Sequence, residues 1–439
     1  MKRIFYFLIL LVWVAGENDE SFSTSSGLKL DFSVDTLKMD TVFSQTPSST
    51  YSFWVHNRNN DGLRLSTIRL KRGNQSGFRV NVDGVYLDNS NGSLVNDVEI
   101  RRKDSLLVFV ELTAQETHQP TPQRVEDELL FQLESGAEQR VLLSAWTWDA
   151  KKLFDPVIDR DSVIESSLPI IIYGDMVVKE GVTLTLKNST FFFHASSGLS
   201  VYGSLKTDNC TLRGDRLDDM FSYLPYNRVS GQWNGVHLYS SSTDNHLVDT
   251  EIRNANYGLI CDSADIDSTQ YRLQMERCVV HNCVGTCVET VNSHIRLEDC
   301  QLTNSGDNCL SIIGGLADIN YCTLAQFYPF SAGRLAALSI NSHNTGVTAG
   351  ISHSIVTGYG DDEVMVEQAT GPLSYRFADC LLRTPIVEGD TTHLQNIIWE
   401  TPNDSIQGKK HFIKIDEENF VYDFHLDSVS TAKGLGCYR

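Results

Sequence analysis

Short runs of alternating apolar and polar residues recur from Leu28 to about Trp148, and clusters of turn-forming residues separate them. The clearest runs cover residues 52–56, 63–70, 78–82, 106–110 and 141–146. Alternation with a period of two is the pattern of a strand with one buried face. About seven short strands in about 120 residues are typical of an immunoglobulin-like (Ig-like) sandwich. We therefore predict an all-β fold that begins with an Ig-like β-sandwich over residues 17–150.

A second pattern, a repeat of 22 residues, runs through the rest of the chain. Cys278, Cys300 and Cys322 follow one another at intervals of 22 residues, and an aliphatic side chain stands two positions after each. Asn282 and Asn304 keep the same interval. A fixed period in a strand-rich segment indicates a solenoid. We predict a right-handed parallel β-helix over residues 151–400 and a C-terminal closing segment over residues 401–439.

The cysteines of this repeat are expected to point inward and to stack. Successive coils lie ~4.8 Å apart, whereas the Cβ atoms of a disulfide lie ~3.5–4.5 Å apart. We therefore favour buried free thiols over disulfides and over a zinc site, and we expect Cys300→Ser to leave a hydroxyl group without a partner. The asparagines suit a left-handed corner, where their amides can stack from coil to coil.

The charge of the chain limits the classes of partner. Its 439 residues include 36 Lys and Arg but 56 Asp and Glu, which gives a formal net charge of −20. A nucleic-acid-binding protein needs a basic surface, so this charge argues against nucleic acid. It also disfavours polyanionic substrates, unless a local basic cleft or a bound cation intervenes.

The first sixteen residues predict export. Lys2 and Arg3 precede an apolar run over residues 4–14, and small residues follow, which is the pattern of a cleaved secretory signal peptide over residues 1–16. Residues 14–16 are also similar to a bacterial lipobox, but Glu17 stands where that motif requires the cysteine that carries the lipid. We expect a mature chain that starts near Glu17, carries no lipid and has no transmembrane segment.

Several segments together resemble a known group of proteins. Residues 40–43 and 53–57 resemble the N-terminal Ig-like module of bacterial cell-envelope proteins that carry right-handed parallel β-helix repeats, which are usually lipoproteins. Residues 214–219 and 231–236 resemble an early coil of that group, and residues 422–426 resemble its closing motif. The resemblance implies a location in the periplasm, the outer membrane or the cell surface of a Gram-negative bacterium. It implies no reaction.

Two acidic segments of the repeat are candidates for catalysis. Residues 305–310 are similar to a polygalacturonase motif, but Asn308 replaces its second carboxylate, and inverting hydrolysis needs two carboxyl groups. Asp307 alone cannot perform that reaction, and the 22-residue register already accounts for the segment. Residues 360–363 are expected to form a solvated turn. We therefore assign no catalytic residue.

The best remaining cluster lies in an apparent insertion between coils, over residues 213–231. Asp215, Asp218 and Asp219 supply carboxylates that suit Ca²⁺, and an exposed Trp233 could stack on a sugar. These four residues are the candidate ligand-binding site. A charged insertion is more commonly a solvated surface, so no metal site is assigned and Ca²⁺ is the only cofactor considered.

These observations favour a non-enzymatic interaction, adhesion or assembly role for an exported β-helix protein, with an unidentified envelope protein or glycan as its partner. The alternative is a polysaccharide-active enzyme, a lyase or a glycoside hydrolase, with an acidic groove. The two hypotheses differ in one structural respect. An enzyme needs carboxylates, or a carboxylate and a base, that converge in one groove, whereas an interaction protein needs only an exposed surface.

Overall fold

The computed structural model describes residues 21–87, 90, 92–219, 221, 223–331, 333–343 and 345–439. The predicted signal peptide and Glu17 lie outside these residues. The chain divides into two compact units. The first comprises the residues up to Gln115 together with Arg124–Thr147, and the second comprises Glu116–Gln123 together with Trp148–Arg439. Within the described residues, no helix has the length and apolar character needed to span a bilayer.

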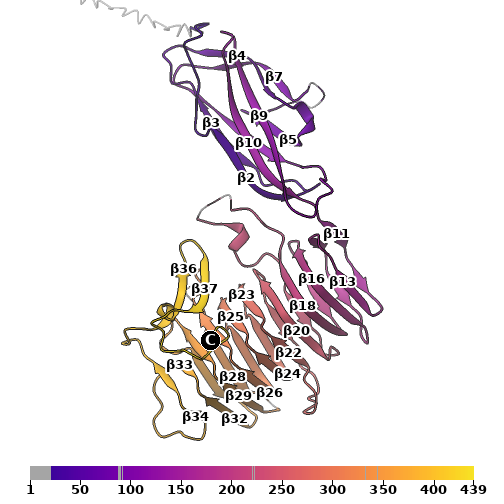
Figure 1. Cartoon of the computed structure of the whole chain (residues 1–439), viewed down its shortest axis with the longest axis vertical. Helices are drawn as coiled ribbons and strands as arrows, with labels where there is room; N and C mark the ends of the chain where they lie inside the picture. The colour runs from indigo at the N-terminus through magenta and orange to yellow at the C-terminus, as the bar shows by residue number, and fades with distance from the viewer. Residues whose placement is uncertain are drawn as a thin grey trace, which may run out of the picture. The chain divides into compact units, whose positions relative to one another are not determined.

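The first unit contains two five-stranded sheets (Figure 1). The strands of the first sheet are all antiparallel and follow the order β1 (Asp31–Phe32), β3 (Tyr51–His56), β8 (Ser105–Leu112), β5 (Phe78–Val82) and β6 (Val85–Tyr86). The second sheet has the order β2 (Thr36–Phe43), β10 (Glu138–Trp148), β9 (Gln123–Leu133), β4 (Leu63–Leu70) and β7 (Leu94–Ile100). A 3₁₀ helix, η1 (Gly73–Gln75), follows β4.

Alternation along these strands buries one face of each sheet. In β3, Phe53 and Val55 are buried while Trp54 between them is exposed. Phe32 of the first sheet and Phe131 of the second have ring centroids 5.0 Å apart, so the two buried faces meet. The period-two pattern therefore produces two facing sheets with a shared apolar interior.

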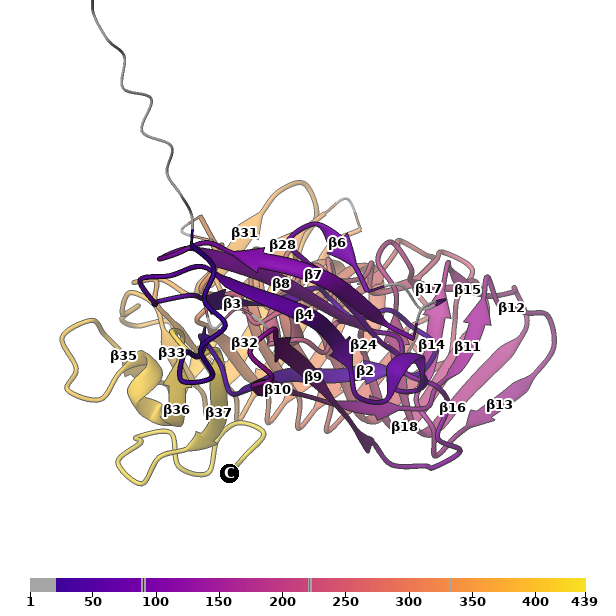
Figure 2. The ribbon, with the colours of Figure 1, turned by 90° about the horizontal axis from the view of Figure 1, so that it is seen from above.

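The second unit is a parallel β-helix whose 25 sheet strands follow one another in chain order (Figures 1 and 2). Each coil contributes to three faces. Face A contains β12 (Val157–Ile158), β15 (Met176–Val178), β17 (Leu199–Val201), β19 (Val236–Leu238), β21 (Leu259–Cys261), β28 (Leu338–Ser342) and β31 (Val364–Gln368). Face B contains β13 (Ser162–Glu165), β22 (Leu273–Glu276), β29 (Val347–Ser352), β32 (Leu373–Ala378) and β34 (Leu394–Gln395).

Face C completes each coil. It contains β11 (Lys151–Phe154), β14 (Ile170–Tyr173), β23 (Val279–Cys283), β25 (Gln301–Ser305), β27 (Thr323–Gln326), β30 (Ile355–Gly358), β33 (Leu381–Arg383) and β35 (Ile398–Glu400). Five longer strands turn a corner: β16 (Thr183–Phe193), β18 (Ser204–Gly214) and β20 (Asn245–Arg253) run from face B to face C, and β24 (Val288–Glu298) and β26 (Leu310–Asn320) from face A to face B.

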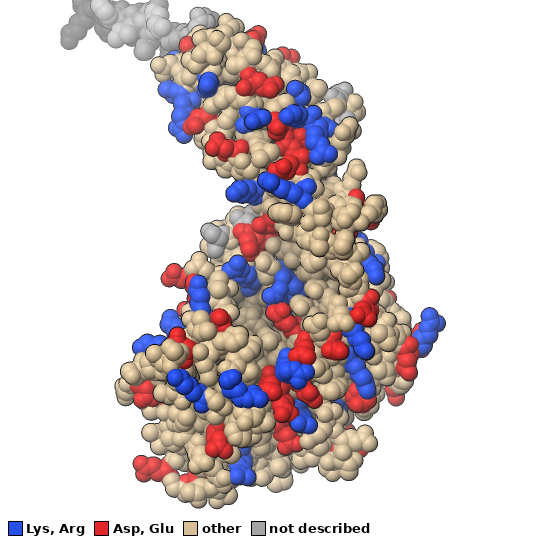
Figure 3. All heavy atoms as spheres, viewed as in Figure 1, with Lys and Arg blue, Asp and Glu red and all other residues tan. Residues whose placement is uncertain are grey.

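Charged side chains cover the outside of the β-helix in pairs rather than in blocks. Arg277 donates hydrogen bonds of 2.8 and 2.9 Å to Asp249 of the preceding coil, and Lys206 Nζ lies 2.8 Å from Asp244 Oδ2 of the following coil. Figure 3 shows acidic and basic side chains interspersed over the visible surface. Pairing of opposite charges across neighbouring strands offsets part of the repulsion that a net charge of −20 creates.

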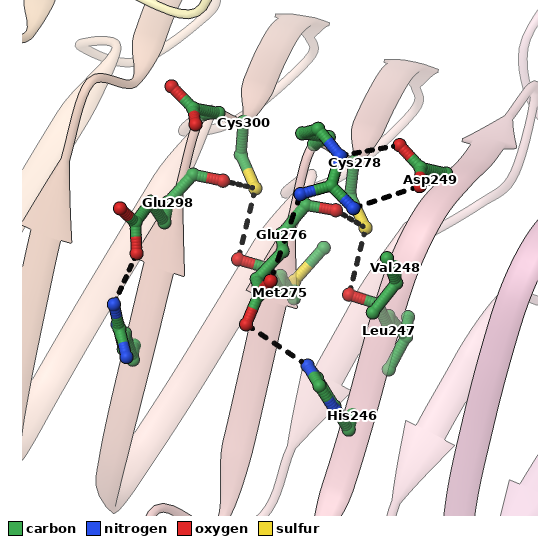
Figure 4. Close-up of polar contacts among 12 residues, drawn as sticks. His246, Leu247, Val248, Asp249, Met275, Glu276, Cys278, Glu298 and Cys300 are labelled. Carbon is green, nitrogen blue, oxygen red and sulfur yellow. Dashed lines mark hydrogen bonds and ion pairs between the residues drawn. The ribbon is translucent and has the colours of Figure 1, made fainter.

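The 22-residue interval places equivalent cysteines in register, as the sequence predicts. Val279 pairs with Gln301, and Gln301 pairs with Thr323, so the cysteines that precede them stack on successive coils. Cys278 and Cys300 are buried, and each sulfur lies 3.3–3.4 Å from two backbone carbonyl oxygens that its single S–H group can reach (Figure 4). All ten cysteines lie in the described part of the chain, and each is a free thiol.

Asparagine forms the corner after face C, also as predicted. Asn254, Asn282 and Asn304 have φ values of +61°, +61° and +57°. The side-chain amide of Asn282 donates to Asn254 Oδ1 at 2.9 Å. The left-handed conformation is accessible to asparagine, and the Asn282–Asn254 hydrogen bond satisfies polar groups that the corner would otherwise bury without partners. The amide nitrogen of Asn304 is buried and has no hydrogen-bond partner among the described residues.

The C-terminal segment packs on the outside of face C. After η4 (Gly408–His411), strands β36 (Phe412–Asp416) and β37 (Val421–Leu426) form an antiparallel hairpin. Its apolar side chains share a buried cluster with outward-facing residues of the β-helix, including Ala325, Ile355 and Leu381. In Figure 2 the yellow hairpin accordingly lies beside the orange coils that contain β33 and β35.

Candidate functional site

The structure places the three predicted carboxylates in one loop but gives each its own partner. The loop lies between β18 and β19 and contains the 3₁₀ helix η3 (Tyr226–Arg228), so the predicted insertion between coils is present. Asp215 Oδ2 lies 2.6 Å from His194 Nδ1. Asp218 accepts two hydrogen bonds from Arg216, at 2.7 and 2.8 Å, and Asp219 Oδ2 lies 4.0 Å from an Arg228 nitrogen.

This arrangement does not suit calcium. Ca²⁺ requires six to eight oxygen ligands around one point, usually from several carboxylates. Among the described residues, no group of three or more His, Cys, Asp or Glu side chains is arranged to hold a metal ion. The loop therefore lacks the converging carboxylates that the calcium hypothesis requires.

The expectation that Trp233 is exposed is wrong. Its side chain is 0% exposed, its ring stacks on Phe193 with centroids 4.3 Å apart, and its indole nitrogen donates to the Arg253 carbonyl oxygen at 2.9 Å. Trp233 forms a single bridge with Ala255 of the next coil, at the point where the insertion rejoins the β-helix. A large aromatic side chain at this re-entry point fills the core, so it cannot stack on a sugar.

A different site, which sequence reasoning missed, lies along face A and the turns that precede it. It is an open groove of about 660 Å³, named here the face-A groove. Its lining consists of Asp175, Gly198, Leu199, Ser200, Asn234, Gly235, Val236, His237, Tyr239, Asn256, Tyr257, Ile260, Val284, Gly285 and Asp307. The volume falls within the range of roughly 300–1,000 Å³ that is typical of ligand sites.

Aromatic rings form one part of the face-A groove. Tyr239 stacks between Tyr202 and His237, with centroid separations of 4.2 and 4.0 Å. Tyr257 is 43% exposed, and its ring lies directly over Gly285, where an added Cβ would come within 2.3 Å of a ring carbon. The absence of a side chain at Gly285 therefore leaves room for the Tyr257 ring against the backbone of the next coil.

Carboxylates form the other part. Asp175 and Asp307 line the groove, and Asp262 Oδ1 lies 2.9 Å from His237 Nε2. Strand register stacks His237, Ile260 and Glu289 on the outward side of successive coils. Burial raises the pKa of Glu289, and the negative charges of Asp307 and Asp262 raise it further, so these three carboxyl groups share one electrostatic environment.

The two acidic segments noted in the sequence have different roles. Asp307 of the polygalacturonase-like segment lines the groove, whereas Asn308 is buried and donates to the Ala336 carbonyl oxygen at 2.6 Å. In the second segment, the Asp361 side chain is 84% exposed, as a solvated turn predicts. Glu363 is only 2% exposed and accepts hydrogen bonds from two backbone N–H groups, so the prediction is wrong for this residue.

Comparison with known proteins supports the fold. A family model described as a right-handed β-helix region matches residues 170–324. No curated protein matches the chain in sequence. Among solved structures, the chain is similar to the catalytic unit of a thermostable GH87 alpha-1,3-glucanase from Streptomyces thermodiastaticus, at 10% identity over 80% of this chain and 89% of that chain, with a TM-score of 0.26.

Two further solved structures match smaller parts. The Vibrio cholerae VesB protease is 15% identical over 27% of this chain and 31% of that chain, with a TM-score of 0.18. The ASH/PapD-like domain of human CEP192 is 9% identical over 34% of this chain and 100% of that chain, with a TM-score of 0.20. TM-scores this low identify no shared activity. The family model and the strand register agree, and the chain is an all-β repeat protein that contains a right-handed parallel β-helix.

Proposed function

We propose that this chain is a non-enzymatic carbohydrate-recognition protein, and that the β-helix binds an extended glycan along the face-A groove. The observation that carries the proposal is the exposed Tyr257 ring, which lies against Gly285 in a groove that also contains carboxylates and amides. A flat ring stacks on the C–H face of a sugar, while carboxylate and amide oxygens accept hydrogen bonds from its hydroxyl groups.

The charge of the groove favours neutral or amino-sugar glycans. Asp175 and Asp307 line the groove and supply negative charge, Asp262 lies against His237 of the lining, and of the described residues that line the groove none is Lys or Arg. A groove whose charge is of one sign repels ligands whose charge has the same sign. A polymer of uronic acids would therefore be excluded, whereas a neutral chain would not be.

The second candidate function is glycoside hydrolysis, which the environment of Glu289 favours. An inverting hydrolase needs one carboxyl group that stays protonated and a second that activates water, about 6.5–9.5 Å away. Burial and neighbouring carboxylates raise the pKa of Glu289, which is the property of the acid in such a pair. Asp262 or Asp307 would then act as the base.

The location of the protein belongs to the same proposal. The leader-like residues 1–16 support export, and the motifs quoted above support a place in a bacterial envelope or on its surface. The paired sheets of the first unit would act as an Ig-like spacer or interaction module.

Binding is tested with the full mature chain on a glycan array, followed by titration calorimetry with the best neutral glycan. Tyr257→Ala should weaken binding by about tenfold, equivalent to ~1.4 kcal/mol. Gly285→Ala should do the same, because the new methyl group would displace the Tyr257 ring. Tyr86→Ala, at an exposed tyrosine of the first unit, is the matched control and should bind normally. Equal binding by all three variants would show that the glycan does not bind in the face-A groove.

Hydrolysis is tested by the release of reducing sugar from the glycan that binds. Glu289→Gln keeps the shape of the side chain but cannot transfer a proton. Turnover that Glu289→Gln abolishes without loss of binding would make the hydrolase the correct function. Binding without turnover in the unmodified protein would support the recognition role.

A further inference from the structure

A second cavity, of about 440 Å³, lies beneath the C-terminal hairpin. We name it the C-terminal cavity. Its lining consists of Asn227, Arg228, Glu251, Arg253, Asn254, Val279, His281, Asn282, Gln301, Phe420, Val421, Tyr422, Phe424 and Tyr438. The floor is the outward side of face C, one wall is the inserted loop, and the other wall is the hairpin β36–β37, which Figure 1 draws in yellow beside β23 and β25.

The cavity is built independently of any ligand. Arg228 of the inserted loop donates to the Asn419 carbonyl oxygen of the hairpin at 2.9 Å, which joins the two walls. The Asn254 amide donates to the Asn227 carbonyl oxygen at 2.9 Å, so the asparagine corner holds the loop against the floor. A cavity that its own hydrogen bonds hold open avoids part of the ordering cost of binding.

Two buried donors without protein partners belong to side chains that line this cavity. The Arg253 Nε atom and the Tyr422 hydroxyl group are both buried, and neither has a hydrogen-bond partner among the described residues. Both residues line the cavity. A buried donor without an acceptor destabilises the folded protein, so a ligand that supplies an acceptor oxygen to both would remove two such penalties.

The charges of the lining favour an anion. Two guanidinium groups line the cavity, those of Arg228 and Arg253, against the single carboxylate of Glu251. Glu251 lies 3.3 Å from Arg253 and Asp219 lies 4.0 Å from Arg228, while burial and the negative charges of Glu417 and Asp416 raise the pKa of Tyr422. In a protein of net charge −20, this excess of positive charge is local.

The remaining lining is neutral and partly aromatic. Burial and the nearby charge of Arg253 lower the pKa of His281 to about 3, so its ring is uncharged near neutral pH. His281 makes edge contacts with Tyr422 and Phe424, at centroid distances of 5.2 and 6.1 Å. A ring-shaped ligand body would therefore meet aromatic edges and faces rather than charges.

We propose that the C-terminal cavity is a binding site for a small ring-bearing carboxylate, whose oxygens accept hydrogen bonds from Arg253 Nε and the Tyr422 hydroxyl group. Arginine donates to carboxylates in a fixed planar geometry, and the tyrosine hydroxyl supplies a second donor. Sugar acids and aromatic acids share this chemistry. The site lies on face C and does not depend on the glycan groove of face A.

The test is titration calorimetry of the full mature chain with glucuronate and with benzoate, and with glucose and inorganic phosphate as comparison ligands. Binding of either carboxylate, with no binding of glucose or phosphate, is the expected result. Glucuronate alone would identify the source as a sugar acid, and benzoate alone as an aromatic acid. Preference for phosphate, or no binding of either carboxylate, would overturn the assignment.

Two variants connect binding to the orphaned donors. Tyr422→Phe removes only the hydroxyl group, and Arg253→Gln removes the cation. Each should weaken carboxylate binding at least tenfold. Because the Tyr422 hydroxyl has no protein partner, Tyr422→Phe should not lower the melting temperature of the free protein, which separates a binding effect from a folding effect. Tyr271→Phe is the matched control, because it removes a hydroxyl group that donates to Asp318 on the surface. Unchanged affinity in Tyr422→Phe and Arg253→Gln would refute the site.

Discussion

Arg383 and Glu400 stack on adjacent coils of face C and form an ion pair, with Arg383 Nη1 2.6 Å from Glu400 Oε1. Their side chains are 6% and 1% exposed. Glu400 also accepts hydrogen bonds from the Gly408 backbone N–H and the Thr357 hydroxyl group, at 2.7 and 2.8 Å. The pair therefore fastens the C-terminal segment to the last coils of the β-helix.

Removing one member of this pair should be costly. Glu400→Leu would remove the buried counter-ion of Arg383 and leave it the exposed carboxylate of Asp361, 3.9 Å away, so we expect a loss of about 3–5 kcal/mol in the free energy of unfolding. The double variant Arg383→Met with Glu400→Leu should recover much of that loss, because no charge remains buried. Urea unfolding measures both. Lys206→Met, which breaks an exposed pair with Asp244, is the control and should cost no more than about 1 kcal/mol. Equal losses in Glu400→Leu and Lys206→Met would contradict the argument.

The structure changes the expected effect of Cys300→Ser. The sequence suggested that a hydroxyl group in this column would lack a partner. Ser354, which stands at the equivalent position of a later coil, is fully buried and donates to the Ser352 carbonyl oxygen at 2.7 Å. A serine at position 300 would have the Glu298 carbonyl oxygen in the same place, since the Cys300 thiol already contacts it.

Cys300→Ser should therefore lose no more than about 1 kcal/mol of stability, within the range of ordinary tolerated substitutions. Cys300→Ala removes both the donor and the volume of the sulfur, and we expect it to cost roughly 1–3 kcal/mol. Thermal and urea unfolding of the two variants give the order of their stabilities. A larger loss for Cys300→Ser than for Cys300→Ala would restore the original expectation. Alkylation before and after denaturation checks that these thiols are buried and reduced.

The contrast between the cysteine column and the face-A groove explains what sequence alone could predict. Cys278, Cys300 and Cys322 keep a constant interval because coils without insertions repeat one geometry. Tyr257 and Gly285 are also neighbours on successive coils, but their separation of 28 residues follows from an insertion that breaks the period. A site assembled from outward positions of unequal coils leaves no regular signal in the chain.

Trp233 shows how proximity in the sequence can suggest a site that the fold does not form. Its closeness in sequence to Asp215 and Asp218 predicts a place beside them, yet the chain has already re-entered the β-helix at this point. Proximity in an irregular segment does not define the side on which a residue lies, because the turn geometry that decides it depends on contacts with the next coil.

Glu363 should make stability fall as the pH rises. Burial raises the pKa of Glu363 from 4.5 to about 7. Between these two values the folded chain holds a proton that the unfolded chain has released, so the free energy of unfolding decreases with increasing pH, by up to about 3 kcal/mol from this group. Urea unfolding between about pH 4.5 and about pH 7.5 measures the slope. Glu363→Gln has no group that titrates at this position, so its free energy of unfolding should depend less steeply on pH than that of the unmodified protein. Equal slopes in the two proteins would show that Glu363 keeps its ordinary pKa.

The last prediction concerns polymers of uronic acids, for which we expect no turnover by the face-A groove. Asp175 and Asp307 line this groove, and of the described residues in its lining none is Lys or Arg. A lyase removes a proton next to a carboxylate and must neutralise that carboxylate with a cation. The inserted loop brings no set of carboxylates together that could recruit Ca²⁺ for this purpose, as each pairs separately. Pectin and alginate should therefore give neither unsaturated product nor reducing sugar, with or without added Ca²⁺.

Asp175→Asn combined with Asp307→Asn should increase binding of these polymers, because it removes repulsion without adding a catalytic group. Turnover of pectin or alginate that Glu289→Gln abolished would instead establish the enzyme and contradict the electrostatic argument.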